Sequence, residues 1–124
     1  MYDHEALKRR ARRAQPNEVC GFILDDGTII DIPNVAGDPT ASFAMDQTVF
    51  RDCWRQYGPR YAAIWHTHPT GLAHPSSGDF EAMSLPGMYL PHWDYLIVTQ
   101  FEVTTWDLKR YQPVDDSYWS GFAV

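Results

Sequence analysis

The sequence predicts an α+β fold, a small mixed β-sheet with helices on its faces. Three observations carry this prediction: short apolar runs of strand length, longer segments bounded by helix start and stop signals, and turn-forming residues between them. The chain has 124 residues, of which 44% are hydrophobic. That composition is enough for one hydrophobic core and little else, so we expect a single domain over residues 1–124.

The expected elements, in chain order, are a helix over 3–14, strands over 19–24 and 28–32, a helix over 46–57, a strand over 61–65, a helix over 79–85, and strands over 95–99 and 102–109. Asp3 is a cap for the first helix, which ends before Pro16. Asp25-Asp26-Gly27 is a hairpin signal that is also compatible with a loop of three residues. Gly58-Pro59 stops the second helix, and a tight turn near Gln100-Phe101 joins the last two strands.

Two histidines follow the apolar run at 61–65, which has the pattern of a buried strand. Residues two apart on a strand point to the same side, so His66 and His68 can approach one ion together. The segment 69–75 is rich in turn formers and predicts a loop that returns over them, and the next helix would hold Asp79 in its first turn. Three protein ligands leave one open position, which distinguishes a catalytic zinc from a structural one.

Each part of this pattern also has a plainer interpretation. Ser76-x-x-Asp79 is a helix capping pattern, and a His-x-His at a strand end is more often a pair of surface residues. The combination of two imidazoles, a serine and a carboxylate in one short segment argues against these plainer interpretations. Capping and metal binding are also compatible, since Ser77 can cap the helix while Asp79 binds the ion.

A hydrolytic metal centre needs a base, because zinc alone lowers the pKa of a bound water only to about 7. Glu18, directly before the strand at 19–24, is the candidate. Its plainer interpretation is a solvated residue at a strand start, and spacing alone does not select it over Glu5 or Glu81.

These positions together resemble the JAMM motif of the MPN-domain metalloproteases, and the similarity spans nearly the whole chain. The matching parts are Glu18 within Glu-x-Cys-Gly-Phe, His66-Thr67-His68-Pro69, Ser76, Asp79, Asn34 and the segment 38–43. The resemblance implies a deaminase-like single MPN/JAMM domain in which a curved mixed β-sheet is flanked by helices.

The resemblance also implies the chemistry. One Zn²⁺ per chain would be bound by His66, His68 and Asp79. Glu18 would activate the zinc-bound water as general acid and base, and Ser76 would stabilise the oxyanion. The implied activity is hydrolysis of an amide or isopeptide bond in a protein or peptide substrate, such as a ubiquitin-like protein or its C-terminal tail.

Two other functions remain open. One is a peptidase associated with phage tail assembly, because the segment 38–43 is similar to that of phage members. The other is a non-catalytic scaffold module, against which the complete ligand set and Glu18 argue. A zinc deaminase would need a Cys-x-x-Cys pair, which the sequence lacks.

Net charge and hydropathy limit the classes of partner and the cellular location that we expect. A net charge of −6 and a pI near 5.1 argue against nucleic acid or an anionic membrane as the main partner. The basic residues at 8–13 predict a solvated helix face, with an acidic partner surface as the alternative. No apolar run has the length of a signal or transmembrane segment, so we expect a cytoplasmic protein. The resemblance implies a bacterial or phage origin, because the chain lacks the long insertions of the eukaryotic deubiquitinases of the family.

Cysteines and aromatic residues complete the predicted core. Cys20 and Cys53 fit a reducing compartment and are expected to be small buried hydrophobes. Trp93 is expected in the core, with a substrate groove as the alternative for the segment 89–93. His74 is expected to be a surface residue. The central aromatic residues of the core are expected to be Phe22, Trp65 and Tyr95.

Overall fold

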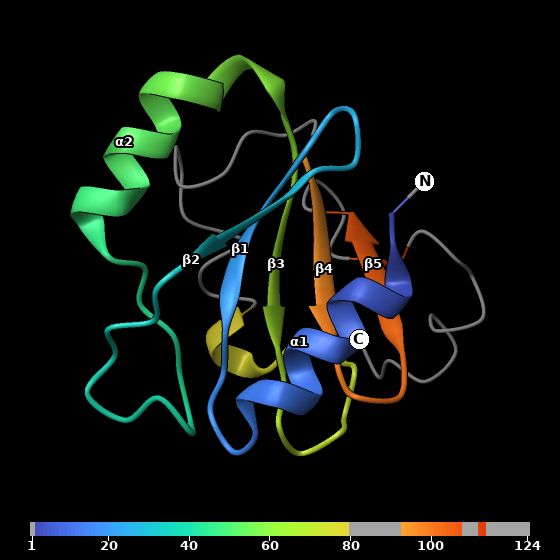
Figure 1. The fold of residues 1–124 in the computed structure, drawn as a ribbon. Helices are drawn as coiled ribbons and strands as arrows, with labels where there is room; N and C mark the ends of the chain where they lie inside the picture. Colours follow the sequence, from blue (N-terminus) through green and yellow to red (C-terminus); the bar gives the residue numbers. More distant parts are fainter. Residues whose placement is uncertain (1, 80–92, 108–111, 114–124) are drawn as a thin grey trace.

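A mixed β-sheet lies at the centre of the structure, a computed structural model that describes residues 2–79, 93–107 and 112–113 (Figure 1). The strands are β1 (Cys20–Leu24), β2 (Ile29–Ile32), β3 (Tyr61–Thr67), β4 (Asp94–Val98), β5 (Val103–Asp107) and β6 (Gln112–Pro113). Their spatial order is β2-β1-β3-β4-β5-β6. Only β3 and β4 pair in parallel among these described strands. The predicted α+β fold with a mixed sheet is confirmed.

Both predicted helices in the first half of the chain are present, and each is preceded by an acidic cap, of which the one at Asp3 was expected. The helices are α1 (His4–Ala14), α2 (Gln47–Tyr57) and the short 3₁₀ helix η1 (Gly58–Arg60). The side chain of Asp3 accepts the N–H of Ala6, and that of Asp46 accepts the N–H groups of Thr48 and Val49. These bonds satisfy donors that have no partner within the helix, so the local sequence fixes both starts. None of the described helices is long and apolar enough to cross a membrane.

The alternation of side chains along the central strands covers both faces of the sheet. α1 packs on one face, in front of the strands in Figure 1, through a cluster that includes Leu7, Ala11, Ile23, Trp65, Leu96 and Val98. α2 packs on the opposite face, against a cluster that includes Phe22, Ile64, Trp93, Tyr95 and Ile97. The core positions expected for Phe22, Trp65, Tyr95 and Trp93 are therefore confirmed. Tyr89 and His92 lie outside the described residues.

The observed turns and short elements can be compared with the helix and strand boundaries predicted from the sequence. Leu24 and Thr28 pair across a three-residue loop in which Gly27 has a φ of 90°, a conformation that glycine adopts without strain. The turn near Gln100-Phe101 is closed by Thr99, whose hydroxyl accepts two backbone N–H groups. β6 was not predicted, because two residues carry no periodic pattern. Residues 77–79 are helical, and the rest of the helix expected over 79–85 lies outside the described residues.

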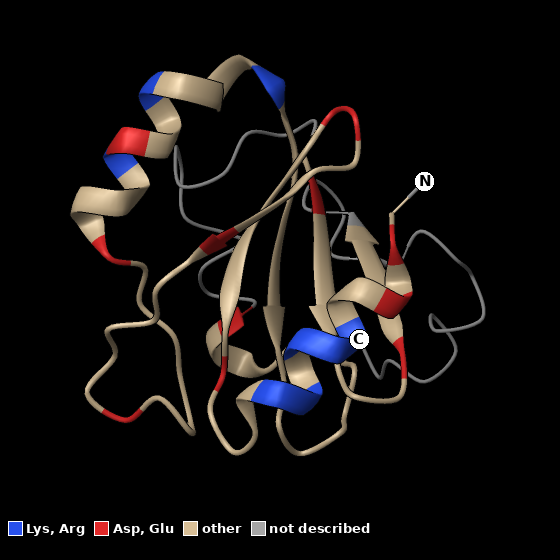
Figure 2. Ribbon diagram, in the orientation of Figure 1, with Lys and Arg blue, Asp and Glu red and all other residues tan. Residues whose placement is uncertain are grey.

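Basic side chains gather on α1, as Figure 2 shows. Arg9, Arg12 and Arg13 are exposed, which agrees with the predicted solvated face. Arg10 is only partly exposed, and its Nε lies 2.7 Å from Oδ1 of Asp31 on β2. This ion pair ties α1 to the edge strand β2.

The two cysteines are free, and their environments differ. Cys20 is buried in β1, and burial raises the pKa of its thiol to about 12. Cys53 is half-buried on α2, and burial also raises its pKa. We expect iodoacetamide at pH 8 to modify Cys53 well before Cys20 in the native protein, because the thiolate is the reactive form and must be accessible.

Intact-mass measurement over time checks this order. Cys53→Ser should leave a native protein that reacts slowly, while urea should make Cys20 reactive in both proteins. Rapid modification of Cys20 without denaturant would contradict the packing of β1 described above.

Candidate metal centre

The register between β1 and β3 brings the candidate base to the candidate ligands. Cys20 lies opposite His66 in this antiparallel pair. Continued beyond this pair, the same register places Glu18, two residues before Cys20, opposite His68, two residues after His66. Because side chains two apart share a face, both histidines and Glu18 lie on the side of the sheet that α2 covers. Residues 48 or more positions apart in the sequence are thus brought to one place.

The backbone around both histidines is held by the sheet. β3 continues two residues past the predicted strand, so His66 lies within it. The N–H of His68 donates to the carbonyl of Val98 at 2.8 Å, which extends the parallel pairing with β4 beyond the end of β3. Both imidazoles therefore start from a rigid element, as the pattern predicted.

The loop after β3 turns back over the site and orients the second imidazole. Gly71 has a φ of 85°, and its N–H donates to the carbonyl of His68 at 3.1 Å. This tight turn places the carbonyl of Leu72 2.8 Å from Nδ1 of His68. Since a carbonyl can only accept, Nδ1 carries the hydrogen and Nε2 keeps its lone pair for an ion.

Ser76 and Asp79 form a reciprocal capping box at the start of the helical residues 77–79. The N–H of Asp79 donates to Oγ of Ser76 at 3.1 Å, and the N–H of Ser76 donates to Oδ2 of Asp79 at 2.8 Å. Ser76 is therefore the capping residue, as the Ser76-x-x-Asp79 pattern indicated, and the alternative cap by Ser77 is not the one formed. Capping and ligand geometry hold together, because the cap fixes the Asp79 carboxylate where the histidines meet it.

Three ligand atoms converge with the spacing that a tetrahedral ion requires. Nε2 of His66 lies 2.9 Å from Nε2 of His68 and 3.3 Å from Oδ1 of Asp79. Nε2 of His68 lies 3.1 Å from Oδ2 of Asp79. Bonds of about 2.0–2.1 Å to a tetrahedral zinc would place neighbouring ligand atoms about 3.3 Å apart. The donor set of two imidazole nitrogens and one carboxylate oxygen thus fits a metal, with one position left open.

Burial and hydrogen bonding set the protonation of the ligands. Burial lowers the pKa of the fully buried His66. Burial alone would raise the pKa of Asp79, but its hydrogen bonds with His66 and His68 hold that pKa well below the usual range. Burial opposes the charge on His68, yet the bonds to Asp79 and Leu72 raise its pKa overall. The carboxylate and His66 are therefore already in the forms that bind a metal, while a proton competes for His68.

Glu18 differs from Asp79 in its surroundings. Its side chain is buried, with 8% of the residue exposed. Burial raises the pKa of Glu18 to about 7; His68 works against this shift and Asp79 adds to it. A carboxyl group with such a pKa can accept and release a proton near neutral pH.

A cavity of about 910 Å³ joins these residues to the core on the α2 face. Its polar lining includes Glu18, His68, Ser76 and Asp79. Its apolar wall includes Phe22, Phe43, Met45, Phe50, Ile64, Leu72, Trp93 and Tyr95. His74 also lines it, half-buried with its ring 5.5 Å from that of Trp106, so it is less exposed than we expected.

Two residues of this region had no assigned role in the sequence analysis. Phe43 stacks on His66, and Asn34 bonds to the backbone of Glu18. Both lie in the segment between β2 and α2, which has no periodic pattern. The resemblance to the JAMM motif was the one signal that singled out this segment.

The capping box leads to a stability prediction. Ser76→Ala removes the acceptor for the Asp79 N–H, so we expect the free energy of unfolding of the metal-free protein to fall by about 1 kcal/mol, a typical loss for a helix cap. Ser76→Thr should keep most of the wild-type free energy of unfolding, because threonine retains the hydroxyl. Ser77→Ala, at the exposed neighbouring position, should change this free energy little. Urea unfolding followed by circular dichroism measures all three, and an effect larger in Ser77→Ala than in Ser76→Ala would show that the cap is misassigned.

Comparisons with known proteins agree with this geometry. A family model described as prokaryotic homologs of the JAB domain matches residues 3–109. The solution structure of protein DSY2949 from Desulfitobacterium hafniense is similar, with a TM-score of 0.61 and 26% identity over 88% of this chain and 82% of that one. No curated protein matches the chain. The family match covers most of the chain and includes every residue of the candidate metal centre, so the chain belongs to the JAMM/MPN family as a prokaryotic homologue of the JAB domain.

Proposed function

We propose that the protein is a zinc metallopeptidase that hydrolyses a peptide or isopeptide bond in a ubiquitin-like protein or its C-terminal tail. The observation that carries the proposal is the convergence of His66, His68 and Asp79 beside Glu18 and Ser76, which line a cavity. The JAB family includes metalloisopeptidases, which supports the assignment. A scaffold module would not need a buried carboxyl group next to a complete ligand set.

The metal would be held by His66, His68 and Asp79, and when bound it would supply a Lewis acid for the scissile carbonyl and the attacking water. Glu18 accepts a proton from that water and then donates it to the leaving amine, for which its pKa near neutrality is suited. Because Ser76 Oγ accepts the Asp79 N–H, its hydroxyl hydrogen is left to donate to the developing oxyanion.

The cavity supports a substrate that carries an apolar side chain near the scissile bond. Its lining combines polar groups of the candidate centre with many aromatic and aliphatic side chains. A wall of this kind favours burial of apolar surface, while the few polar groups orient the reacting bond. A flexible peptide tail fits such a site, because it can place one side chain in the cavity and its backbone beside the polar groups.

Metal content tests the centre. We expect about one zinc per chain in wild-type protein purified with zinc, and loss of zinc in His68→Ala and Asp79→Asn, because a site with two ligands binds weakly. His74→Ala is the matched control, since His74 lines the same cavity but is not among the converging ligands. Elemental analysis of the folded proteins measures this. A wild-type chain that takes up no zinc would refute the metallopeptidase assignment and favour the scaffold alternative.

The role of Glu18 has a separate signature. Glu18→Gln keeps a similar shape but cannot accept the proton, so we expect kcat to fall at least about a hundredfold while zinc content is unchanged. Glu5→Gln, on the exposed face of α1, should be fully active. Cleavage of ubiquitin-like fusions and of peptides with apolar side chains provides the assay. Full activity in Glu18→Gln would assign the base to another residue.

A further inference from the structure

The two histidines of the metal centre are held in different ways. Metal-binding histidines usually donate their second ring N–H to a carbonyl or carboxylate, and this bond fixes the ring. His68 follows the rule through its Nδ1 contact with Leu72. His66 does not, since its Nδ1 is buried and has no hydrogen-bond partner in the part of the chain that the structure describes. Among the described residues, the Nδ1 side of the His66 ring is therefore held by packing and not by a hydrogen bond.

Aromatic packing fills that role. The ring of Phe43 stacks on that of His66, with centroids 4.6 Å apart and an interplanar angle of 27°. The ring of Tyr95 meets His66 edge-on, at 5.5 Å and 70°. Close-packed neighbours resist rotation of a buried ring, because any turn of the imidazole would press it against them. These two contacts keep Nε2 of His66 directed at the other ligand atoms.

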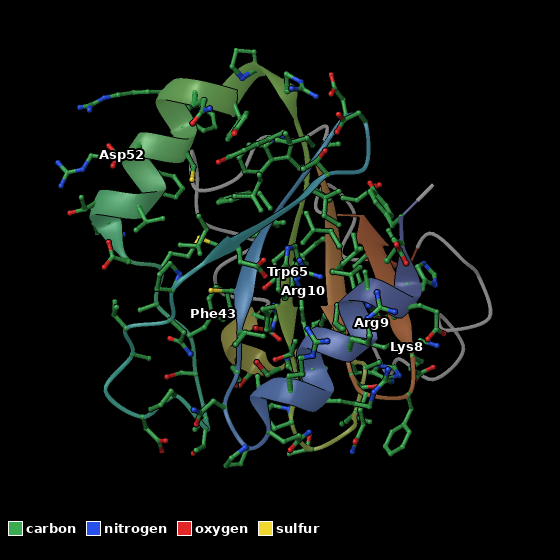
Figure 3. The ribbon with its side chains drawn as sticks, in the orientation of Figure 1. Lys8, Arg9, Arg10, Phe43, Asp52 and Trp65 are labelled. Atoms are coloured by element: carbon green, nitrogen blue, oxygen red, sulfur yellow. The ribbon has the colours of Figure 1, made fainter. Side chains whose placement is uncertain are left out.

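Phe43 is itself held by one amide group. It lies in the segment between β2 and α2, beside β1 and away from the basic residues of α1 in Figure 3. The residues on both sides of Phe43 bond to the side chain of Asn34, which uses two donors and two acceptor positions. The four bonds are Nδ2 to the carbonyls of Glu18 at 2.8 Å and Ser42 at 3.0 Å, and Oδ1 from the N–H groups of Ala36 and Ala44, each at 3.0 Å.

The same segment also holds the backbone of the base. The N–H of Glu18 donates to the carbonyl of Pro39 at 2.7 Å, and the carbonyl of Glu18 accepts from Asn34. Both backbone groups of Glu18 are thus bound by the segment that carries Phe43. One loop therefore contacts the base through its backbone and a metal ligand through its ring.

We propose that Phe43 is a positioning residue that orients His66 for metal binding, and that Asn34 holds Phe43 and Glu18 in place. This inference rests on the proposed function, because it concerns a ligand of the proposed metal centre. It adds two residues that touch neither the ion nor the reacting bond.

The affinity for zinc tests this role without an activity assay. We expect Phe43→Ala to weaken zinc binding about tenfold or more, in line with losses of other groups that orient metal ligands. Phe43→Tyr should bind as the wild type does, and Phe43→Leu should lie between, because it keeps bulk but loses the flat ring. Phe50→Ala is the matched control, since it removes an aromatic ring from the same cavity wall and has no ring contact with His66. Competition with a chromogenic chelator gives each Kd.

The visible spectrum of the cobalt-loaded proteins gives a second readout. It should shift in Phe43→Ala and stay as in the wild type in Phe43→Tyr and Phe50→Ala, because it reports the geometry of the ligands. Should Phe43→Ala fail to fold, the comparison of Phe43→Leu with Phe43→Tyr decides the question. Wild-type affinity and spectrum in Phe43→Ala, or in Phe43→Leu where the alanine variant is unfolded, would overturn the role of the ring.

Asn34→Asp tests the amide. It keeps the shape and the acceptor oxygen but cannot donate to the carbonyls of Glu18 and Ser42, so zinc affinity should fall in the same direction as in Phe43→Ala. Asn17→Asp, an exposed neighbour of the base, adds the same charge and should have no effect. Equal affinities in the two variants would remove Asn34 from the proposal. A wild-type chain that binds no zinc would overturn the metal centre itself, whereas a zinc-binding wild type with unaffected variants would overturn only this positioning role.

Discussion

The antiparallel register of β1 against β3 is the constraint on which the site depends. A slip of one residue would move every side chain of one strand to the other face, which would separate Glu18 from the histidines. Two features of Gly21 and Trp65, which are partners in this register, fix it. The indole N–H of Trp65 donates to the carbonyl of Phe22 at 3.2 Å, and a Cβ atom on Gly21 would lie only 3.0 Å from the indole nitrogen of Trp65. Core packing and site assembly therefore rest on the same pairing.

Local features of the sequence predicted local structure well. The helix cap at Asp3, the hairpin glycine and the pair of histidines at a strand end all depend on residues a few positions apart. The Ser76-x-x-Asp79 pattern belongs to this class: the capping box forms, and it places the Asp79 carboxylate beside the two histidines. The predicted ligand set agrees with the convergence of its three atoms.

Long-range contacts were beyond sequence patterns alone. Spacing could not select Glu18 over other acidic residues, because its place is set by strand pairing with a segment about fifty residues away. Only the resemblance to the JAMM motif identified it. The stacking of Phe43 on His66 was not predicted for the same reason, and the irregular segment that carries Phe43 has no periodicity to follow. The two residues of β6 were likewise too few to form a pattern.

The capping box would couple occupancy of the proposed metal centre to folding of the turn that begins at Ser76. One carboxylate serves both the backbone of that turn and the converging histidines, so the two functions share a single orientation of Asp79. By thermodynamic linkage, an ion that binds this orientation of Asp79 also stabilises the turn. A substitution that unfolds the turn lowers the affinity of the site for the ion in return. A zinc ion bound there would then stabilise the folded turn, in addition to serving as a Lewis acid in the proposed reaction.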